Sequence, residues 1–498
     1  MPIRITGMNS GLDTESIIAE MVKVEKKKVE TTKKEKTAFE WKQEAWKDLN
    51  AKIYKLFRTT LDNMRFAGDW SKKTTELSNS SIASIVTADD AMNTTQKLEV
   101  KNLASAGYMT GGKVTAADGS VANGGTKLSD LGLSGGTTVE LNVGGKTTTI
   151  QVDDGMTIND FTYKLQDAGV EARFDQANGR FHIAAKNNGE KISFSSSNPQ
   201  GEGLLENMGL LEGAQYGDKA AHVTGGDKAK IILNGVEYES TNNTFNINGL
   251  TITAKEVGES TLNTKRDTQN VYDTVKNFIK EYNSLINEMD KLYNAESSKG
   301  YDPLTDEEKE AMSEKEIEKW EGKIKDSVLR RDSTLGSIST TLKEIMLKGA
   351  TVNGKQMVLS NFGIETLGYY EAEDNERNAY HISGDEDFPS KMTETNQLKA
   401  MVEQDPDTVI EFFSQLTMNM YKKMDEMSSS IDKIRSYGKF YDDKVMEDEY
   451  KSYESKIAKQ EKALLEKEDK WYKKFSAMET ALAKLQSNQN ALSSLLGG

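Results

Sequence analysis

The 498-residue sequence contains no cysteine, three histidines and five prolines. Without cysteine the chain can form no disulfide, carry no catalytic thiol and hold no cysteine-ligated zinc. The histidines, His182, His222 and His381, lie far apart, and no two have helical or turn spacing. We therefore expect polar surface histidines and no metal or other cofactor, and stability must come from packing.

Long hydrophobic runs are also absent. No apolar run approaches the roughly 18 residues of a membrane span, which predicts that the chain has no transmembrane segment. The N-terminal "MPIRITGMNSGLD" has neither a charged n-region nor an apolar h-region, so we expect no general secretory signal peptide. If the protein leaves the cell, another export route must carry it.

The sequence has no excess of positive charge. Its 79 acidic and 64 basic side chains give a net charge of −15, which argues against nucleic acid as a partner. The segment "KVEKKKVETTKKEK" at residues 23–36 is locally basic, but its interspersed glutamates indicate a solvated helix face.

Catalytic motifs are missing too. "VGGKTTT" at residues 143–149 superficially resembles a phosphate-binding loop, but the first glycine of that signature is replaced by Glu140. The flanking residues alternate as a hairpin would, with Gly144-Gly145 as its turn. The sequence has no nucleophile elbow, zinc-protease helix or dinucleotide fingerprint. We therefore expect a protein that is not an enzyme.

What the sequence does contain is helical periodicity at both ends. From Thr14 to about Phe66 apolar residues recur at helical spacing, and Asp13 or Ser10 can cap the start. The apolar stripe lapses at residues 31–38, so we expect a break or a change of partner there. At 1.5 Å per residue such a helix would reach about 80 Å, which is too long for a globular core.

The C-terminal helix carries a stronger signal. Large, mostly apolar residues recur at every seventh position, which is the seam of a coiled coil. One helix cannot bury this heptad seam alone, so we expect it to pack against the N-terminal face of Ile17, Met21 and Val24 or against other subunits. The alternative is a long helix packed only within its own subunit. The heptad seam consists of Tyr450, Ile457, Leu464, Trp471, Met478, Leu485 and Leu492.

Residues 71–262 between these ends alternate in the manner of β-strands. Asn178-Gly179, Asn234-Gly235 and Asn248-Gly249 are typical of two-residue hairpin turns. One helix interrupts the strands at "TINDFTYKLQDAG", where Thr157 and Asp160 have capping-box spacing and Gly169 is a stop signal.

Helical periodicity resumes at about Asp267 and returns after "DP" at Asp405-Pro406, which is typical of an N-cap followed by the first helical residue. A short β-like insert precedes it. The sequence thus predicts an α+β, multidomain chain with long terminal coiled-coil helices, a helical bundle and an inserted β-rich region of one or two domains.

Several separated segments resemble the flagellar hook-associated protein 2 family, the filament cap proteins. They are "SGLDTESIIAEMV", "EYNSLI", "DPLTDEEKEAMSEKEIEKWE" and "YKKFSAMETALAKLQSNQNALSSLL", and they occur in the order of the family. Residues 141–194 also resemble the repeat of flagellin and hook proteins, although they begin "LN" where that repeat usually has "IN".

The resemblance implies four parts and a secreted location at the distal filament tip. We expect a terminal coiled-coil docking domain, a helical bundle with a small β insert near 350–385, an inner β domain, and an outer β-rich domain with the flagellin-like repeat. Their expected residues are, in that order, 1–38 with 440–498, 39–71 with 263–439, 72–105 with 227–262, and 106–226.

The implied function is an oligomeric cap that guides flagellin polymerisation and prevents the loss of flagellin monomers. Implied partners are further copies of the chain in a ring, flagellin, the hook-filament junction proteins, and the flagellar export chaperone with its type III export apparatus. The alternative is a filament-tip adhesin that binds host mucin or glycans through the β-rich insertion. Self-assembly and docking would use Leu12, Ile17, Ile18, Met21, Val24, Ile457, Leu464, Trp471, Met478, Leu485 and Leu492.

Overall fold

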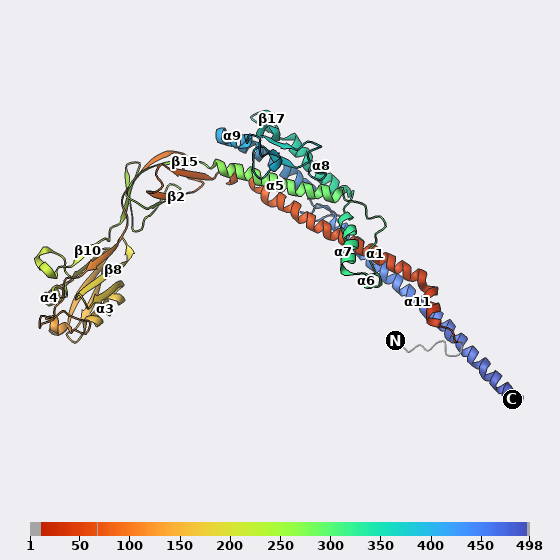
Figure 1. Ribbon diagram of the computed structural model, residues 1–498, viewed down its shortest axis with the longest axis horizontal. Helices are drawn as coiled ribbons and strands as arrows, with labels where there is room; N and C mark the ends of the chain where they lie inside the picture. Colours follow the sequence, from red (N-terminus) through yellow and green to blue (C-terminus); the bar gives the residue numbers. More distant parts are fainter. Residues whose placement is uncertain (1–10, 67, 496–498) are drawn as a thin grey trace. The chain divides into compact units, whose positions relative to one another are not determined.

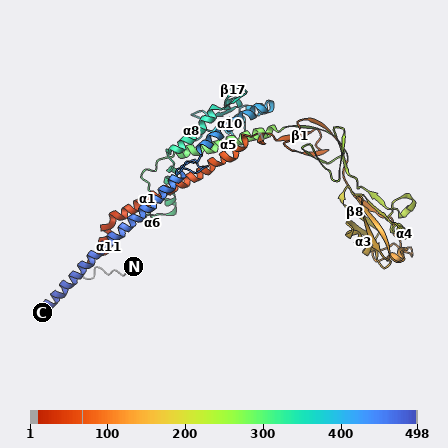
Figure 2. The same ribbon diagram turned by 180° about the vertical axis from the view of Figure 1, so that it is seen from behind.

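The computed structural model describes residues 11–66 and 68–495 (Figures 1 and 2). The chain divides into two compact units, one formed by Met1–Trp70 with Thr268–Gly498 and the other by Ser71–Asp267. The first unit is mainly helical, and the second consists mainly of antiparallel sheets. The predicted α+β class, with long terminal helices and an inserted β-rich region, is confirmed.

The first unit begins with α1 (Thr14–Lys55), which continues through a π-helical turn (Leu56–Leu61) into α2 (Asp62–Met64). Asp13 caps α1, because its Oδ1 accepts a hydrogen bond from the Ser16 amide at 3.0 Å. Ser10, the other candidate cap, lies outside the described residues.

The expected interruption at residues 31–38 is a change of contacts and not a break, since α1 stays helical throughout. Charged side chains take over where the apolar stripe lapses: Lys33 pairs with Glu461 at 2.7 Å and Lys34 with Glu308 at 2.6 Å. Ion pairs with neighbouring elements therefore replace apolar packing over these two turns.

One hydrophobic core holds the rest of this unit together, and α1 contributes Trp46, Leu49 and Ile53 to it. Asp405 caps α10 (Pro406–Met427) as predicted, because its Oδ1 accepts a hydrogen bond from the Thr408 amide at 3.1 Å. The helices are α5 (Thr268–Tyr293), α6 (Asp306–Glu310), α7 (Glu314–Ser327), α8 (Ser333–Lys348), α9 (Gln397–Gln404), α10 (Pro406–Met427) and α11 (Asp443–Leu495), and the strands, in two pairs, are β16 (Ala350–Val352), β17 (Lys355–Met357), β18 (Ile364–Thr366) and β19 (Tyr380–Ile382).

The second unit contains four antiparallel sheets around two hydrophobic clusters. The sheets β1-β15-β3-β11-β12 and β13-β14-β2 contribute to one cluster, and β10-β4-β8-β7 and β6-β5-β9 to the other. The elements are β1 (Lys73–Leu77), β2 (Ala83–Thr87), β3 (Thr95–Asn102), β4 (Ala106–Thr110), β5 (Thr137–Val143), β6 (Lys146–Val152), α3 (Ile158–Asp167), β7 (Val170–Asp175), β8 (Arg180–Asn188), β9 (Ile192–Ser195), α4 (Pro199–Asn207), β10 (His222–Thr224), β11 (Ala229–Leu233), β12 (Val236–Ser240), β13 (Thr244–Ile247), β14 (Leu250–Ala254) and β15 (Gly258–Arg266).

Two of the three predicted Asn-Gly turns are tight hairpins. At Asn234-Gly235 and Asn248-Gly249 all four φ angles are positive, as a type I′ turn requires. Gly144-Gly145 forms the same kind of turn between β5 and β6, which confirms the hairpin interpretation of "VGGKTTT".

The two-residue turn predicted at Asn178-Gly179 is wrong. Asp175 pairs with Arg180 across β7 and β8, so the loop has the four residues 176–179. The Asp175 carboxylate accepts from the Ala177 amide at 3.0 Å and thereby builds a wider turn before the glycine is reached.

The helix within the second unit forms as its sequence predicts. Thr157 and Asp160 form a reciprocal capping box at the start of α3, and Gly169 has a φ of 102° just past its end.

The histidine prediction is partly wrong. His222 is exposed and His182 is half-buried with a hydrogen bond to Tyr108, but both ring nitrogens of His381 are buried in the small β18-β19 sheet region. Within the described residues no group of histidine, aspartate and glutamate could hold a metal ion. No described helix is long and apolar enough to cross a membrane.

Candidate docking surface of the terminal helices

The terminal helices α1 and α11 pack side by side in an antiparallel pair (Figures 1 and 2). The Gln43 side-chain amide donates to the Met446 carbonyl at 3.0 Å, and nearer the ends of the chain Glu25 pairs with Lys467. Residue numbers therefore rise along α1 as they fall along α11.

The N-terminal part of α1 has one face that packs inside the subunit. Thr14, Ile18 and Val22 are buried at successive helical turns, and Val29 is buried two turns further along the same face. Val29 and Leu464 of the heptad seam line the same cavity, which Leu304 closes from a third segment. This face consequently supplies the apolar contact within the subunit.

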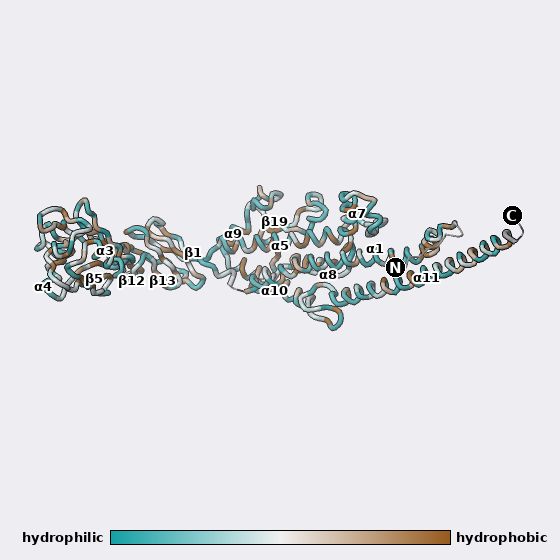
Figure 3. The backbone as a smooth tube through the Cα atoms, turned by 90° about the horizontal axis from the view of Figure 1, so that it is seen from below, coloured by the Kyte–Doolittle hydropathy of each residue, from teal (hydrophilic) through white to brown (hydrophobic). Residues whose placement is uncertain are grey.

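The heptad seam is only partly covered. Ile457, Leu464, Trp471 and Met478 are half-buried, whereas Leu485 and Leu492 are 64% and 61% exposed. Hydrophobic positions recur along the mainly hydrophilic α11 in Figure 3.

The antiparallel pairing explains where the cover ends. Glu25 of α1 lies opposite Lys467 of α11. From this pair α1 extends eleven residues further, back to its start at Thr14, and the same length of α11 ends at Met478. Beyond Met478 the α11 seam has no stretch of α1 beside it.

A second apolar face of α1 is open. Met21 and Val24 are exposed, Val24 by 63%, and Ile17 is half-buried; Leu12, just before the helix, is exposed as well. The expectation that the Ile17, Met21 and Val24 face packs on the heptad seam within the subunit is therefore wrong. Both faces of this helix carry apolar residues, so their spacing alone could not show which face packs inside the subunit.

We call Leu12, Met21, Val24, Leu485 and Leu492 the open apolar residues. Leu465 is also 61% exposed, but it lies off the heptad seam, and no sequence signal distinguished it. Among the predicted docking residues, Ile18 is buried and the open apolar residues are exposed. The remaining five are half-buried: Ile17, Ile457, Leu464, Trp471 and Met478.

The charges around this surface are paired. A hydrogen bond from Lys467 lowers the pKa of Glu25, and a hydrogen bond to Tyr450 raises the pKa of Lys36. Such exposed pairs contribute little to stability, because solvent screens them. The exposed apolar residues, and not these pairs, are therefore the feature that suits this surface to binding another protein.

Comparison with known proteins identifies the family. The model for the C-terminus of flagellar hook-associated protein 2 matches residues 226–487, and the model for its N-terminus matches residues 10–107. The chain belongs to the flagellar hook-associated protein 2 family. It is thus a flagellar filament cap protein, a structural and non-enzymatic component of the flagellum outside the cell.

Relatives in this family are distant in sequence. Flagellar hook-associated protein 2 of Halalkalibacterium halodurans is 25% identical over 444 residues, which cover 82% of this chain and 78% of the relative. That of Thermotoga maritima is 26% identical over 364 residues, or 70% of this chain and 54% of the relative. The crystal structure of the D1-D2-D3 domains of the Escherichia coli flagellar cap protein FliD aligns with 76% of this chain and 95% of that chain, at 19% identity and a TM-score of 0.43.

Proposed function

We propose that copies of this chain form a ring at the distal end of the filament, with the open apolar residues docking into neighbouring subunits. The ring guides incoming flagellin into place and keeps unpolymerised flagellin from escaping. The observation that carries this role is that α11 extends past the start of α1 with Leu485 and Leu492 still on its apolar seam. Large exposed apolar residues on one surface mark an interaction site.

Burial on assembly would supply the binding energy. Burying one leucine side chain on assembly stabilises the complex by roughly 1.5–3 kcal/mol. Two such residues therefore contribute several kcal/mol of binding free energy per subunit. That gain must also offset the entropy of ordering the helix ends, so the proposed cap is held by several subunits acting together.

The proposal extends to the four-part division and to the partners. The separate hydrophobic clusters of the second unit support an inner β domain at 72–105 with 227–262 and an outer one at 106–226. The helical unit would comprise the docking pair, 1–38 with 440–498, and the bundle, 39–71 with 263–439. The partners of the whole protein would be flagellin, the hook-filament junction proteins, and the export chaperone with the type III apparatus.

A deletion strain tests this function. Loss of filaments together with monomeric flagellin in the medium is what a cap predicts, and electron microscopy of the purified full-length protein should show closed rings or plates. Normal filaments in the deletion strain, or dispersed monomers at high concentration, would contradict the proposal.

A further inference from the structure

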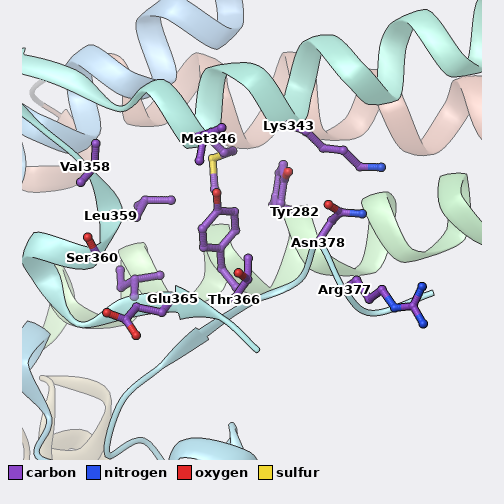
Figure 4. Close-up of a pocket in the computed structure, with 13 residues that line it drawn as sticks. Tyr282, Lys343, Met346, Val358, Leu359, Ser360, Glu365, Thr366, Arg377 and Asn378 are labelled. Carbon is purple, nitrogen blue, oxygen red and sulfur yellow. The ribbon is translucent and has the colours of Figure 1, made fainter. Parts of the chain in front are cut away.

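A pocket of about 530 Å³ opens in the helical unit between α5, α8 and β18 (Figure 4). Met346, Leu359 and Ile364 contribute apolar walls, and Leu347 lies at the pocket with its side chain largely exposed. Tyr282 also lines it, and the buried Tyr282 hydroxyl has no hydrogen-bond partner among the described residues. An unpaired buried hydroxyl is costly, so the pocket suits an apolar group accompanied by a hydrogen-bond acceptor.

The segment 365–376, whose first two residues line the pocket, is acidic and aromatic. Residues 365–376 carry five carboxylates and no lysine or arginine. Within this segment Tyr370 is 97% exposed, and Tyr369 lies under the guanidinium of Arg377, which itself lines the pocket. The cations of the pocket are occupied, since Lys343 pairs with Asp290 and Arg377 with Asp374.

A hairpin elsewhere in the same unit has the complementary character. Residues 428–440, which join α10 to α11 and which we call the basic hairpin, contain three basic residues and one acidic residue. Ile431, Ile434 and Tyr437 are exposed on it. The hairpin is well anchored, because the Phe440 amide donates to Asn50 Oδ1 at 2.8 Å and the Ile431 amide to the Arg435 carbonyl at 2.9 Å.

We propose that the basic hairpin of one copy docks into the Tyr282 pocket of a second copy. An isoleucine from the hairpin fills the apolar cavity, and a main-chain carbonyl beside it accepts a hydrogen bond from the Tyr282 hydroxyl. The cations of the hairpin face the acidic segment 365–376. The inference rests on the proposed ring, to which it adds a specific contact between copies.

The placement of the two surfaces favours a second copy of this chain as the occupant. The basic hairpin packs against α1, whereas the pocket lies at α5 and α8, so one subunit can use both at once. A contact between two different surfaces of identical subunits is head-to-tail, and such contacts generate a ring when the rotation between neighbours closes. Opposite charge on the two surfaces disfavours the alternatives of hairpin on hairpin and pocket on pocket.

The absence of native cysteine allows a direct test. Full-length protein with Ser360→Cys at the pocket and Asp432→Cys on the basic hairpin is treated with a short bismaleimide under assembling conditions, and sedimentation measures self-association in parallel. We expect a ladder of crosslinked oligomers, and none when Ser452→Cys on exposed α11 replaces Ser360→Cys. Adding Ile434→Ser should reduce crosslinking at least about fivefold, and adding Tyr282→Phe roughly threefold.

Each other outcome is decisive. Self-association without the ladder overturns this contact and leaves the proposed ring intact, whereas no self-association overturns both. A ladder that added flagellin suppresses overturns the choice of a second copy as the occupant. A ladder that Ile434→Ser and Tyr282→Phe leave unchanged, in variants with normal circular dichroism, overturns the docking geometry.

Discussion

Tyr272 and Tyr282 are both buried on α5, but they differ in their hydrogen bonding. The Tyr272 hydroxyl donates to Asp385 and accepts from Asn396 at 2.7 Å, and burial together with Asp385 raises the pKa of Tyr272 to about 12. The Tyr282 hydroxyl has no such partner among the described residues, and burial raises its pKa well above the usual value. These two residues thus allow a matched comparison.

We expect opposite effects from the two Tyr→Phe substitutions in free protein. Tyr272→Phe should lower the free energy of unfolding by about 1.5–3 kcal/mol, because it removes a hydrogen bond to the buried Asp385 carboxylate, which keeps only its contacts with Lys276 and the Asp387 amide. Tyr282→Phe should leave it unchanged or raise it by about 1 kcal/mol, because it removes an unsatisfied hydroxyl. Denaturant unfolding followed by far-UV circular dichroism measures both, and equal losses would show that Tyr282 does have a partner.

His381 makes the helical unit sensitive to acid. Burial, with Lys391 assisting, lowers the pKa of His381, while Glu376 opposes this effect. Below the unfolded value of about 6.5, the unfolded chain binds a proton that the folded chain does not, so the stability contributed by neutral His381 is lost as the pH falls. We expect the free energy of unfolding to decline between pH 7 and 5, and His381→Leu to flatten that decline. An unchanged slope in the variant would contradict the assignment.

Sequence patterns could not reveal these residue-level features. Helical spacing placed Tyr272 and Tyr282 on a helix but could not tell which hydroxyl finds a carboxylate from a distant loop. In the same way, strand-like sequence around His381 did not show that its imidazole would be covered, because the residues that cover it come from other segments.

At the scale of elements, the two faces of α1 should respond differently to substitution. Val22 is buried and Met21 beside it is exposed. Val22→Ser should weaken the pairing of α1 with α11 by about 1.5–3 kcal/mol, through lost burial and a desolvated hydroxyl, whereas Met21→Ser should change it by less than about 0.5 kcal/mol. Hydrogen exchange of the α1 amides in the monomer reports this directly. Similar exchange rates in the two variants would contradict the assignment of faces.

Local signals predicted most elements, and their failures have clear causes. The cap residues Asp13, Thr157 and Asp405 and the turns at Asn234-Gly235 and Asn248-Gly249 act within a few residues, so sequence sufficed for them. At Asn178-Gly179 the upstream Asp175 competed for the backbone and widened the loop. The choice between the two apolar faces of α1 depended on α11, which no local pattern contains.

At the scale of the whole molecule, the chain leaves the helical unit and returns at neighbouring points. The Asp267 amide donates to the Lys72 carbonyl at 2.9 Å, so the two ends of the β-rich unit meet. Replacing residues 71–267 by a short glycine-serine linker should therefore leave a folded helical unit that unfolds in one cooperative transition. Loss of helical circular dichroism or aggregation of this variant would show that the units depend on each other.

The docking role of the open apolar residues is the central claim, and it dictates which residues to change. Leu464 is a poor target, because it lines a cavity with Val29 and its replacement would also damage packing within the subunit. Leu485 and Leu492 lie beyond the covered part of the heptad seam, so Leu485→Ser with Leu492→Ser should leave the subunit fold intact. Leu465→Ser is the matched control, since Leu465 is equally exposed but off the seam.

The most direct measurement is flagellin in the medium and filaments on the cell in a strain that carries only the double variant. Each lost leucine removes roughly 1.5–3 kcal/mol of burial from every docked subunit, so the double variant should be exported and soluble yet leave filaments uncapped, with monomeric flagellin lost. The Leu465→Ser strain should keep normal filaments. Normal filaments and motility in the double-variant strain, at normal export levels, would contradict docking through these helices.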